Sequence, residues 1–250
     1  MRTVAVLVAS ALAAALLASA GMPASAAPER LPDLAMARLK NLEVQTHSDG
    51  RRLLRFDSTI VNVGGSRFEV YGERDSAEQA TMDTVTQRLY YGAGRHRDRP
   101  TGASMYFGGD GHDHWHVRDL ERFSLTRTGS GAAPARIGAK HGFCFWDTLR
   151  FGSKRDPFYT PPRGACGQAS DLRVREGLSV GWGDVYPAHL PDQYVDVTGL
   201  PDGRYTFRAV ADGGGWFREA DESNNFTWTQ IRLEGPKVEV LRHGPSARRP

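Results

Sequence analysis

Three histidines lie at alternate positions near the middle of this 250-residue chain: His112, His114 and His116. Alternate residues of a β-strand point to the same face, so the spacing predicts three imidazoles side by side. Neutral imidazole binds copper, zinc, nickel and iron, and three imidazoles leave a coordination position open for chemistry. In a straight strand the outer two Cα atoms would lie roughly 13 Å apart, so we expect a bend or bulge here. The segment is therefore predicted to be a metal site. The alternative is a solvent-facing strand that carries histidines by chance.

The rest of the chain reads as short strands separated by turns, and no segment has the apolar stripe of an amphipathic helix. Residues 72–110 and 150–176 are rich in Gly, Arg or Pro, and we expect long loops there. The pattern predicts an all-β fold: a β-sandwich-like single domain with long loops and little helix. The expected strands cover residues 53–63, 67–71, 111–125, 142–146, 193–197, 205–210, 226–228 and 231–233.

The first 26 residues have the pattern of a secretory signal peptide. Arg2 precedes an apolar run over residues 4–17, and Ala24-Ser25-Ala26 supplies a cleavage site of small residues. The apolar run is short and no second one follows, so no stable membrane span is expected. We therefore expect an exported protein with a folded domain at residues 27–241 and a disordered tail at 242–250.

Two cysteines and an unusual basic composition further limit the function. In an oxidising compartment, Cys144 and Cys166 predict one disulfide, which would stabilise the fold by roughly 3 kcal/mol; two free thiols are the alternative. The net charge is only +3 and the basic residues are scattered outside the tail, so nucleic-acid binding is not expected. The chain has 28 arginines and four lysines, so a lysine near the metal site would stand out.

Three motifs follow one another along the chain in a recognisable order. They are His112-x-His114-x-His116, Gly138-x-Lys140-x-x-Phe143-Cys144-x-x-Asp147-Thr148 and Gly177-Leu178-Ser179-x-Gly181-x-x-Asp184-x-Tyr186. Their combination resembles the catalytic domain of the lysyl oxidase family, and the likeness covers nearly all of the chain after the signal peptide. The resemblance implies that the three histidines bind copper. It also implies that Lys140 and Tyr186 become a cross-linked lysine tyrosylquinone.

The resemblance also implies a reaction and a second metal site. A quinone next to copper would oxidise a primary amine, including a lysine side chain of a protein substrate, to an aldehyde, using molecular oxygen and releasing hydrogen peroxide and ammonia. Asp184 is our candidate general base, with a turn-forming aspartate as the alternative. A family calcium site is matched by Asp33, the Leu34 carbonyl, Glu219, Asp221, Asn224 and Asn225. These residues supply the oxygen ligands that calcium prefers, although the acidic turn alone would also suit a solvated hairpin.

Two other functions stay open at this point. Three histidines could instead hold zinc and a water molecule for hydrolysis, or the chain could be a non-catalytic exported binding module stabilised by calcium. Lys140 and Tyr186 discriminate between the hypotheses, because neither alternative needs both residues. The sequence also departs from the family: it can form only one disulfide, and Phe123 or Ser124 stands where the family has a further histidine.

Overall fold

The main core lies between two antiparallel sheets that face each other. The computed structural model describes residues 29–92, 94–108, 113–129, 135–161 and 166–248. Phe56 of one sheet meets Phe123 and Phe207 of the other, with ring centres 4.6 Å apart in both pairs. The first sheet consists of β2 (Leu34–Met36), β3 (Lys40–Thr46), β4 (Arg52–Asn62), β14 (Leu149–Arg150), β16 (Trp182–Tyr186) and β17 (Tyr194–Asp196). The second consists of β11 (Arg122–Arg127), β12 (Arg136–Ile137), β18 (Gly203–Val210), β19 (Phe226–Glu234) and β20 (Lys237–His243).

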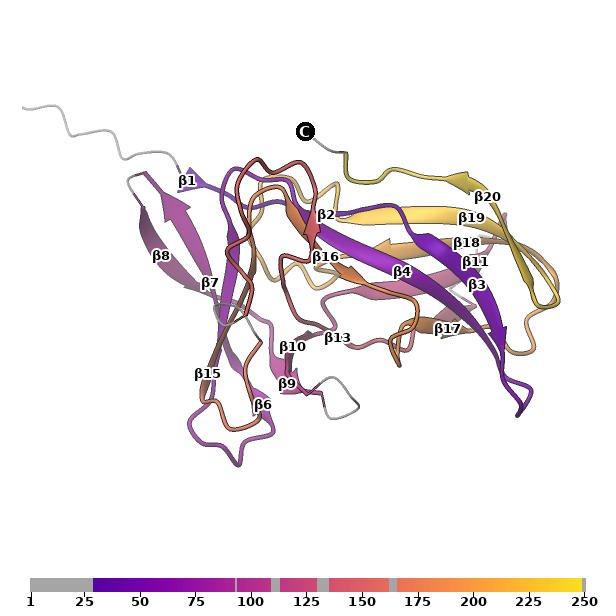
Figure 1. Ribbon diagram of the computed structural model, residues 1–250, viewed down its shortest axis with the longest axis horizontal. Helices are drawn as coiled ribbons and strands as arrows, with labels where there is room; N and C mark the ends of the chain where they lie inside the picture. Colours follow the sequence, from indigo (N-terminus) through magenta and orange to yellow (C-terminus); the bar gives the residue numbers. More distant parts are fainter. Residues whose placement is uncertain (1–28, 93, 109–112, 130–134, 162–165, 249–250) are drawn as a thin grey trace, which may run out of the picture.

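Two further sheets extend the molecule at one end of this sandwich (Figure 1). One consists of β1 (Glu29–Arg30), β5 (Phe68–Glu73), β7 (Thr84–Tyr91), β8 (Arg95–Pro100) and β15 (Arg173–Leu178). The other consists of β6 (Thr81–Met82), β9 (Met105–Phe107), β10 (Trp115–Arg118) and β13 (Gly142–Phe143). All pairings between these strands are antiparallel.

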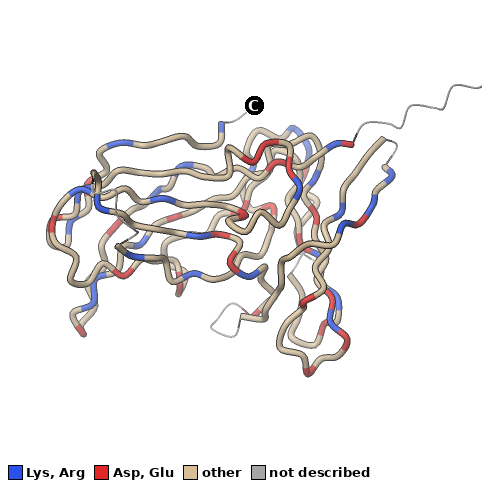
Figure 2. The backbone as a smooth tube through the Cα atoms, turned by 180° about the vertical axis from the view of Figure 1, so that it is seen from behind, with Lys and Arg blue, Asp and Glu red and all other residues tan. Residues whose placement is uncertain are grey.

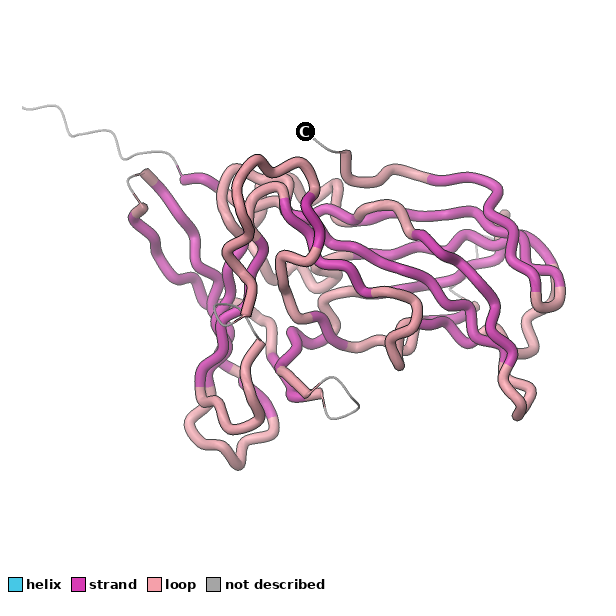
Figure 3. The backbone as a smooth tube through the Cα atoms, viewed as in Figure 1, coloured by secondary structure: helices cyan, strands magenta, loops and turns pink. Residues whose placement is uncertain are grey.

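The all-β prediction is confirmed, because no helix occurs among the residues that the structure describes (Figure 3). Strand β18 illustrates the physical reason. Tyr205, Phe207 and Ala209 alternate into the core, while Arg204 and Arg208 point to solvent. Such a period of two suits a sheet with one buried face. Basic and acidic residues are interspersed over the fold (Figure 2), and the described residues contain no helix that is long and apolar enough to cross a membrane.

The expectation of one long loop at residues 72–110 is wrong. Strands β6 to β9 lie there, and β7 alternates like any half-buried strand, with Val85, Gln87 and Leu89 pointing inward. The pattern is hidden in the sequence because the buried middle position is a glutamine. Its side chain is satisfied by the backbone of Arg218, donating to the carbonyl oxygen at 2.9 Å and accepting from the N–H at 2.8 Å.

The histidine segment and the tail also differ from the expectations. The chain bends at His114, the strand begins only at Trp115, and a turn at Asp119 separates β10 from β11 instead of one strand continuing to residue 125. The bend itself was expected. Arg242 and His243, which we expected in a disordered tail, pair with β19, and the Ala247 N–H donates to the Met36 carbonyl at 2.7 Å. The predicted signal peptide lies outside the described residues.

Candidate active site

Two of the three predicted metal ligands lie side by side in the structure. His112 lies outside the described residues. The rings of His114 and His116 have centres 4.4 Å apart, and His116 is buried at 3% exposure. Because imidazole nitrogens bind metals at about 2.0–2.1 Å, rings this close can direct nitrogens toward one ion. The donor set present therefore fits a histidine-bound transition metal.

A glycine allows the neighbouring strand to lie directly against His116. Strand β10 pairs with β9 on one side and with β13 on the other. In β13, a Cβ atom added at Gly142 would lie 2.7 Å from the Cβ of His116 and would also meet the Tyr106 hydroxyl. No real side chain tolerates that approach. The absence of a side chain at Gly142 therefore allows the histidine strand to lie close to the segment that carries Lys140.

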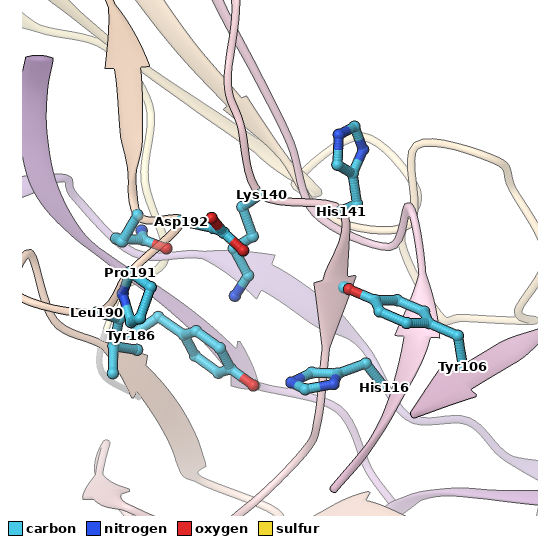
Figure 4. A pocket seen from close by; sticks show the side chains of 10 residues that line it. Tyr106, His116, Lys140, His141, Tyr186, Leu190, Pro191 and Asp192 are labelled. Atoms are coloured by element: carbon cyan, nitrogen blue, oxygen red, sulfur yellow. The ribbon is translucent and has the colours of Figure 1, made fainter. Parts of the chain in front are cut away.

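Lys140 and Tyr186, separated by 46 residues of sequence, meet at the centre of this site. The Lys140 amine lies 2.9 Å from the centre of the Tyr186 ring and 4.5 Å from the centre of the Phe143 ring. Lys140 is 8% exposed and Tyr186 is 6% exposed. Figure 4 shows the amine pointing at the ring and the phenol oxygen pointing toward His116. Lys140, Tyr186 and His116 line, with others, a small cavity of about 30 Å³.

Tyr186 is held rigidly by its strand and by the backbone of Cys144. It lies at the end of β16, opposite Ser58 of β4. Its hydroxyl accepts a hydrogen bond from the Cys144 N–H at 2.9 Å and donates to the Cys144 carbonyl at 3.2 Å. Its ring stacks on Phe143, with centres 4.4 Å apart. Burial, and then the nearby carboxylate of Asp184, raise the pKa of the phenol well above its usual value, so Tyr186 is neutral.

Asp184 shares the buried face of β16 with Tyr186, because the two residues are two positions apart. Its carboxylate accepts from the Thr148 hydroxyl at 2.8 Å and from the Trp146 N–H at 3.2 Å. Burial raises the pKa of Asp184 to about 7, against the lowering effect of the Thr148 hydrogen bond. A group with this pKa can hold or release a proton near neutral pH.

A second buried acid, Glu121, faces Lys140 and was missed in the sequence. Its carboxylate oxygen lies 3.5 Å from the Lys140 amine, and neither side chain is more than 6% exposed. Burial raises the pKa of Glu121, and burial lowers the pKa of the Lys140 amine to about 8, while the attraction between the pair opposes both shifts. The available signal was weak: an acidic residue between Leu120 and Phe123, five positions after the last histidine.

The Cys144–Cys166 disulfide forms as predicted, with Cα atoms 6.1 Å apart. It links the two halves of the site. Cys144 supplies the backbone groups that hold the Tyr186 hydroxyl. The Cys166 carbonyl accepts a hydrogen bond of 2.8 Å from Trp115, which stands between the two described histidines.

The residues predicted to bind calcium come from opposite ends of the chain, and the fold brings them together. The Asp33 carboxylate accepts from the Asn224 amide at 2.7 Å, and Glu219 accepts from Asn225 at 3.0 Å. Glu219 also accepts from the backbone N–H of Leu34. The Asp221 side chain is exposed, and one of its oxygens accepts from the backbone and the hydroxyl of Ser223.

The electrostatics of this cluster fit a bound cation. Burial raises the pKa of Glu219 to about 9 and raises that of Asp33. The side-chain amide oxygens of Asn224 and Asn225 are buried and have no hydrogen-bond partner. Two further acids that the sequence did not single out, Asp212 and Glu222, bring oxygens within 4.8 Å of a Glu219 oxygen. Such a set of oxygen donors, buried and exposed, suits calcium.

Comparison with known proteins agrees with this arrangement. The lysyl oxidase family model matches residues 91–242, which is more than half of the chain. This chain belongs to the lysyl oxidase family. It is 29% identical over 192 residues to lysyl oxidase homolog 4 of Mus musculus and 28% identical over 188 residues to lysyl oxidase homolog 2 of Homo sapiens. Each match covers 75% of this chain but only 20% and 19% of the relative, so the chain spans about a fifth of the length of these relatives.

Proposed function

We propose that this lysyl oxidase family member is an exported copper-dependent amine oxidase. It would convert a primary amine, either a small molecule or a lysine side chain of a protein, to the aldehyde. The overall reaction consumes the amine, molecular oxygen and water, and yields the aldehyde, ammonia and hydrogen peroxide. One observation carries the proposal: the buried Lys140 amine lies 2.9 Å from the centre of the Tyr186 ring, in a cavity that His116 also lines.

Each group of residues in the site has a separate proposed role. We assign His112, His114 and His116 to copper, and Lys140 and Tyr186 to a lysine tyrosylquinone. When formed, that group would supply the electrophilic carbonyl with which a primary amine reacts. The Cys144 backbone and Phe143 hold the ring of Tyr186 in one orientation. The small volume of the cavity excludes bulk water from it.

Asp184 is the proposed proton acceptor for the amine's α-carbon. With a pKa of about 7, Asp184 can both accept and release a proton near neutral pH. The hydrogen bond from Thr148 fixes the orientation of its carboxylate. We also propose a structural calcium ion at the cluster of Asp33, Leu34 and Glu219 with Asp221, Asn224 and Asn225. The disulfide supports the proposed export, because such bonds persist in oxidising compartments.

Peptide mass mapping of protein matured with copper in air tests the proposal. We expect a covalent link between the Lys140 and Tyr186 peptides, and hydrogen peroxide on addition of n-butylamine. Lys140→Met and Tyr186→Phe should lose both signals. Lys154→Met removes an exposed lysine and is the matched control, with both signals retained. Unlinked wild-type peptides without peroxide from any amine would contradict the proposal and leave the zinc hydrolase and the binding module as explanations.

A further inference from the structure

The buried pair of Glu121 and Lys140 needs an explanation beyond stability. Removing two charges from water costs several kcal/mol per ion, and well-packed apolar residues often serve a core as well or better. The other three lysines of the chain, Lys40, Lys154 and Lys237, are all exposed. Lys140 is thus the one lysine that the fold buries, and Glu121 forms its salt bridge.

The backbone around Glu121 places its carboxylate at a defined point of the site. Glu121 lies in the turn between β10 and β11, two residues after Asp119, which has a positive φ of 51°. Hydrogen bonds tie this turn to two neighbouring segments: the Arg118 N–H donates to Ser104 at 2.8 Å, and the Asp119 N–H donates to His141 at 2.6 Å. The second bond connects the turn directly to the residue after Lys140. The backbone segments that carry the carboxylate and the amine are therefore fixed relative to each other.

The other carboxylates near Lys140 are less suited to the same task. Both oxygens of Asp184 already accept hydrogen bonds, from Thr148 and from Trp146. Asp192 lines the cavity but is exposed to solvent. The side chain of Glu121 is completely buried, and its nearest charged atom is the Lys140 amine, 3.5 Å away.

We propose that Glu121 is the positioning residue of Lys140, the carboxylate that holds the lysine amine over the ring of Tyr186 until the two side chains are joined. The inference rests on the proposed function. Joining the amine to the ring replaces one N–H and one ring C–H by a C–N bond, a two-electron oxidation in which oxygen is reduced to hydrogen peroxide. The amine that adds is neutral, and Glu121 takes up the proton that the ammonium group releases. Misplacing reacting groups by 1 Å can slow a reaction about a hundredfold, so the position of the amine matters.

The first experiment measures formation of the Lys140–Tyr186 link by mass mapping during copper loading in air. Glu121→Gln keeps the shape but loses the charge, and we expect link formation to be at least about tenfold slower. Glu121→Asp keeps the charge but places it one methylene farther from the amine, so its rate of link formation should lie between those of the wild type and Glu121→Gln. Glu176→Gln is the matched control. Glu176 is also completely buried, but it accepts a hydrogen bond from Phe145 rather than holding the lysine, so the rate should not change. Equal rates in wild type and Glu121→Gln would overturn the proposal.

A second experiment needs neither copper nor turnover, and it separates this inference from the proposed function. Lys140→Ala removes three methylenes and the amine, which n-propylammonium replaces atom for atom. We expect this ion to raise the Tm of Lys140→Ala by several degrees, whereas uncharged n-propanol should not. The double variant Lys140→Ala/Glu121→Gln should show no response to either compound. No response in Lys140→Ala, or equal responses in both variants, would overturn the role of Glu121. A wild type that never forms the link while the ammonium response appears would count against the proposed function alone.

Discussion

Removing the disulfide should damage both the stability of the protein and the proposed copper site. The perturbation is the double variant Cys144→Ala/Cys166→Ala. The two cysteines are 22 residues apart in sequence, and closing a loop of that length stabilises a fold by roughly 3.4 kcal/mol in the chain-entropy model. Urea unfolding with linear extrapolation measures this loss directly.

The effect on the proposed copper site follows from the hydrogen bonds that the backbones of the two cysteines make. Cys144 holds the Tyr186 hydroxyl, and the Cys166 carbonyl fixes Trp115 between two histidines. We therefore expect the double variant to bind copper more weakly in a titration against a competing chelator.

Leu233→Ala provides the control for general destabilisation. Leu233 is 1% exposed in β19, and such a truncation costs about 2–5 kcal/mol. Leu233→Ala should lose a similar amount of stability but keep the copper affinity of the wild type. A disulfide-free variant with unchanged urea midpoint, or with unchanged copper affinity, would refute the reasoning.

Three further predictions concern single residues. Burial raises the pKa of Glu219 from 4.5 to about 9, so as pH rises through this interval the unfolded chain loses the proton first and the metal-free protein loses stability. Calcium should therefore stabilise the protein by up to about 4 kcal/mol more at about pH 8 than at about pH 5, measured by thermal unfolding with calcium or with a chelator. Glu219→Gln should not show this pH-dependent calcium effect. Gly142→Ala should cost about 1–3 kcal/mol and reduce copper uptake, whereas Gly65→Ala, where a Cβ would meet no atom closer than 3.8 Å, should do neither. Since the pKa of Asp184 is about 7, kcat/KM should fall below that pH, and Asp184→Asn should be about 10²–10⁴-fold slower without that acidic limb; an unchanged profile would exclude Asp184 as the base.

Much of the fold could be predicted from the sequence because most strands carry a clear period of two. Strands β4 and β18 were located closely, since their apolar positions alternate or run continuously. The prediction failed where a buried position is polar, as at Gln87 in β7, because the side chain is satisfied by a backbone 131 residues away. Two expected strands near the end of the chain are one, β19, which pairs without a break with β18 and buries the polar Thr229 between them.

The candidate site was predicted in part for a similar reason. Lys140 and Tyr186 were found through local motifs, and both line the cavity that His116 also lines. Glu121, Asp212 and Glu222 were missed, because a single acid in a polar sequence carries no local sign of what it will face. The ligand roles of all three histidines stay predictions, and His112 lies outside the described residues.

The sequence by itself determined the residue types and their local order: alternate histidines, a rare lysine, a tyrosine after a glycine-rich turn, and a pair of cysteines. Those features indicated the family, and the period of two along most strands indicated the all-β class. Only the tertiary structure decided which side chains meet, because antiparallel pairing joins residues that are far apart in the chain. It placed the Lys140 amine over the Tyr186 ring and Glu121 beside that amine. It also set the burial that raises the pKa of Asp184 and lowers that of Lys140, since desolvation depends on the surrounding sheets.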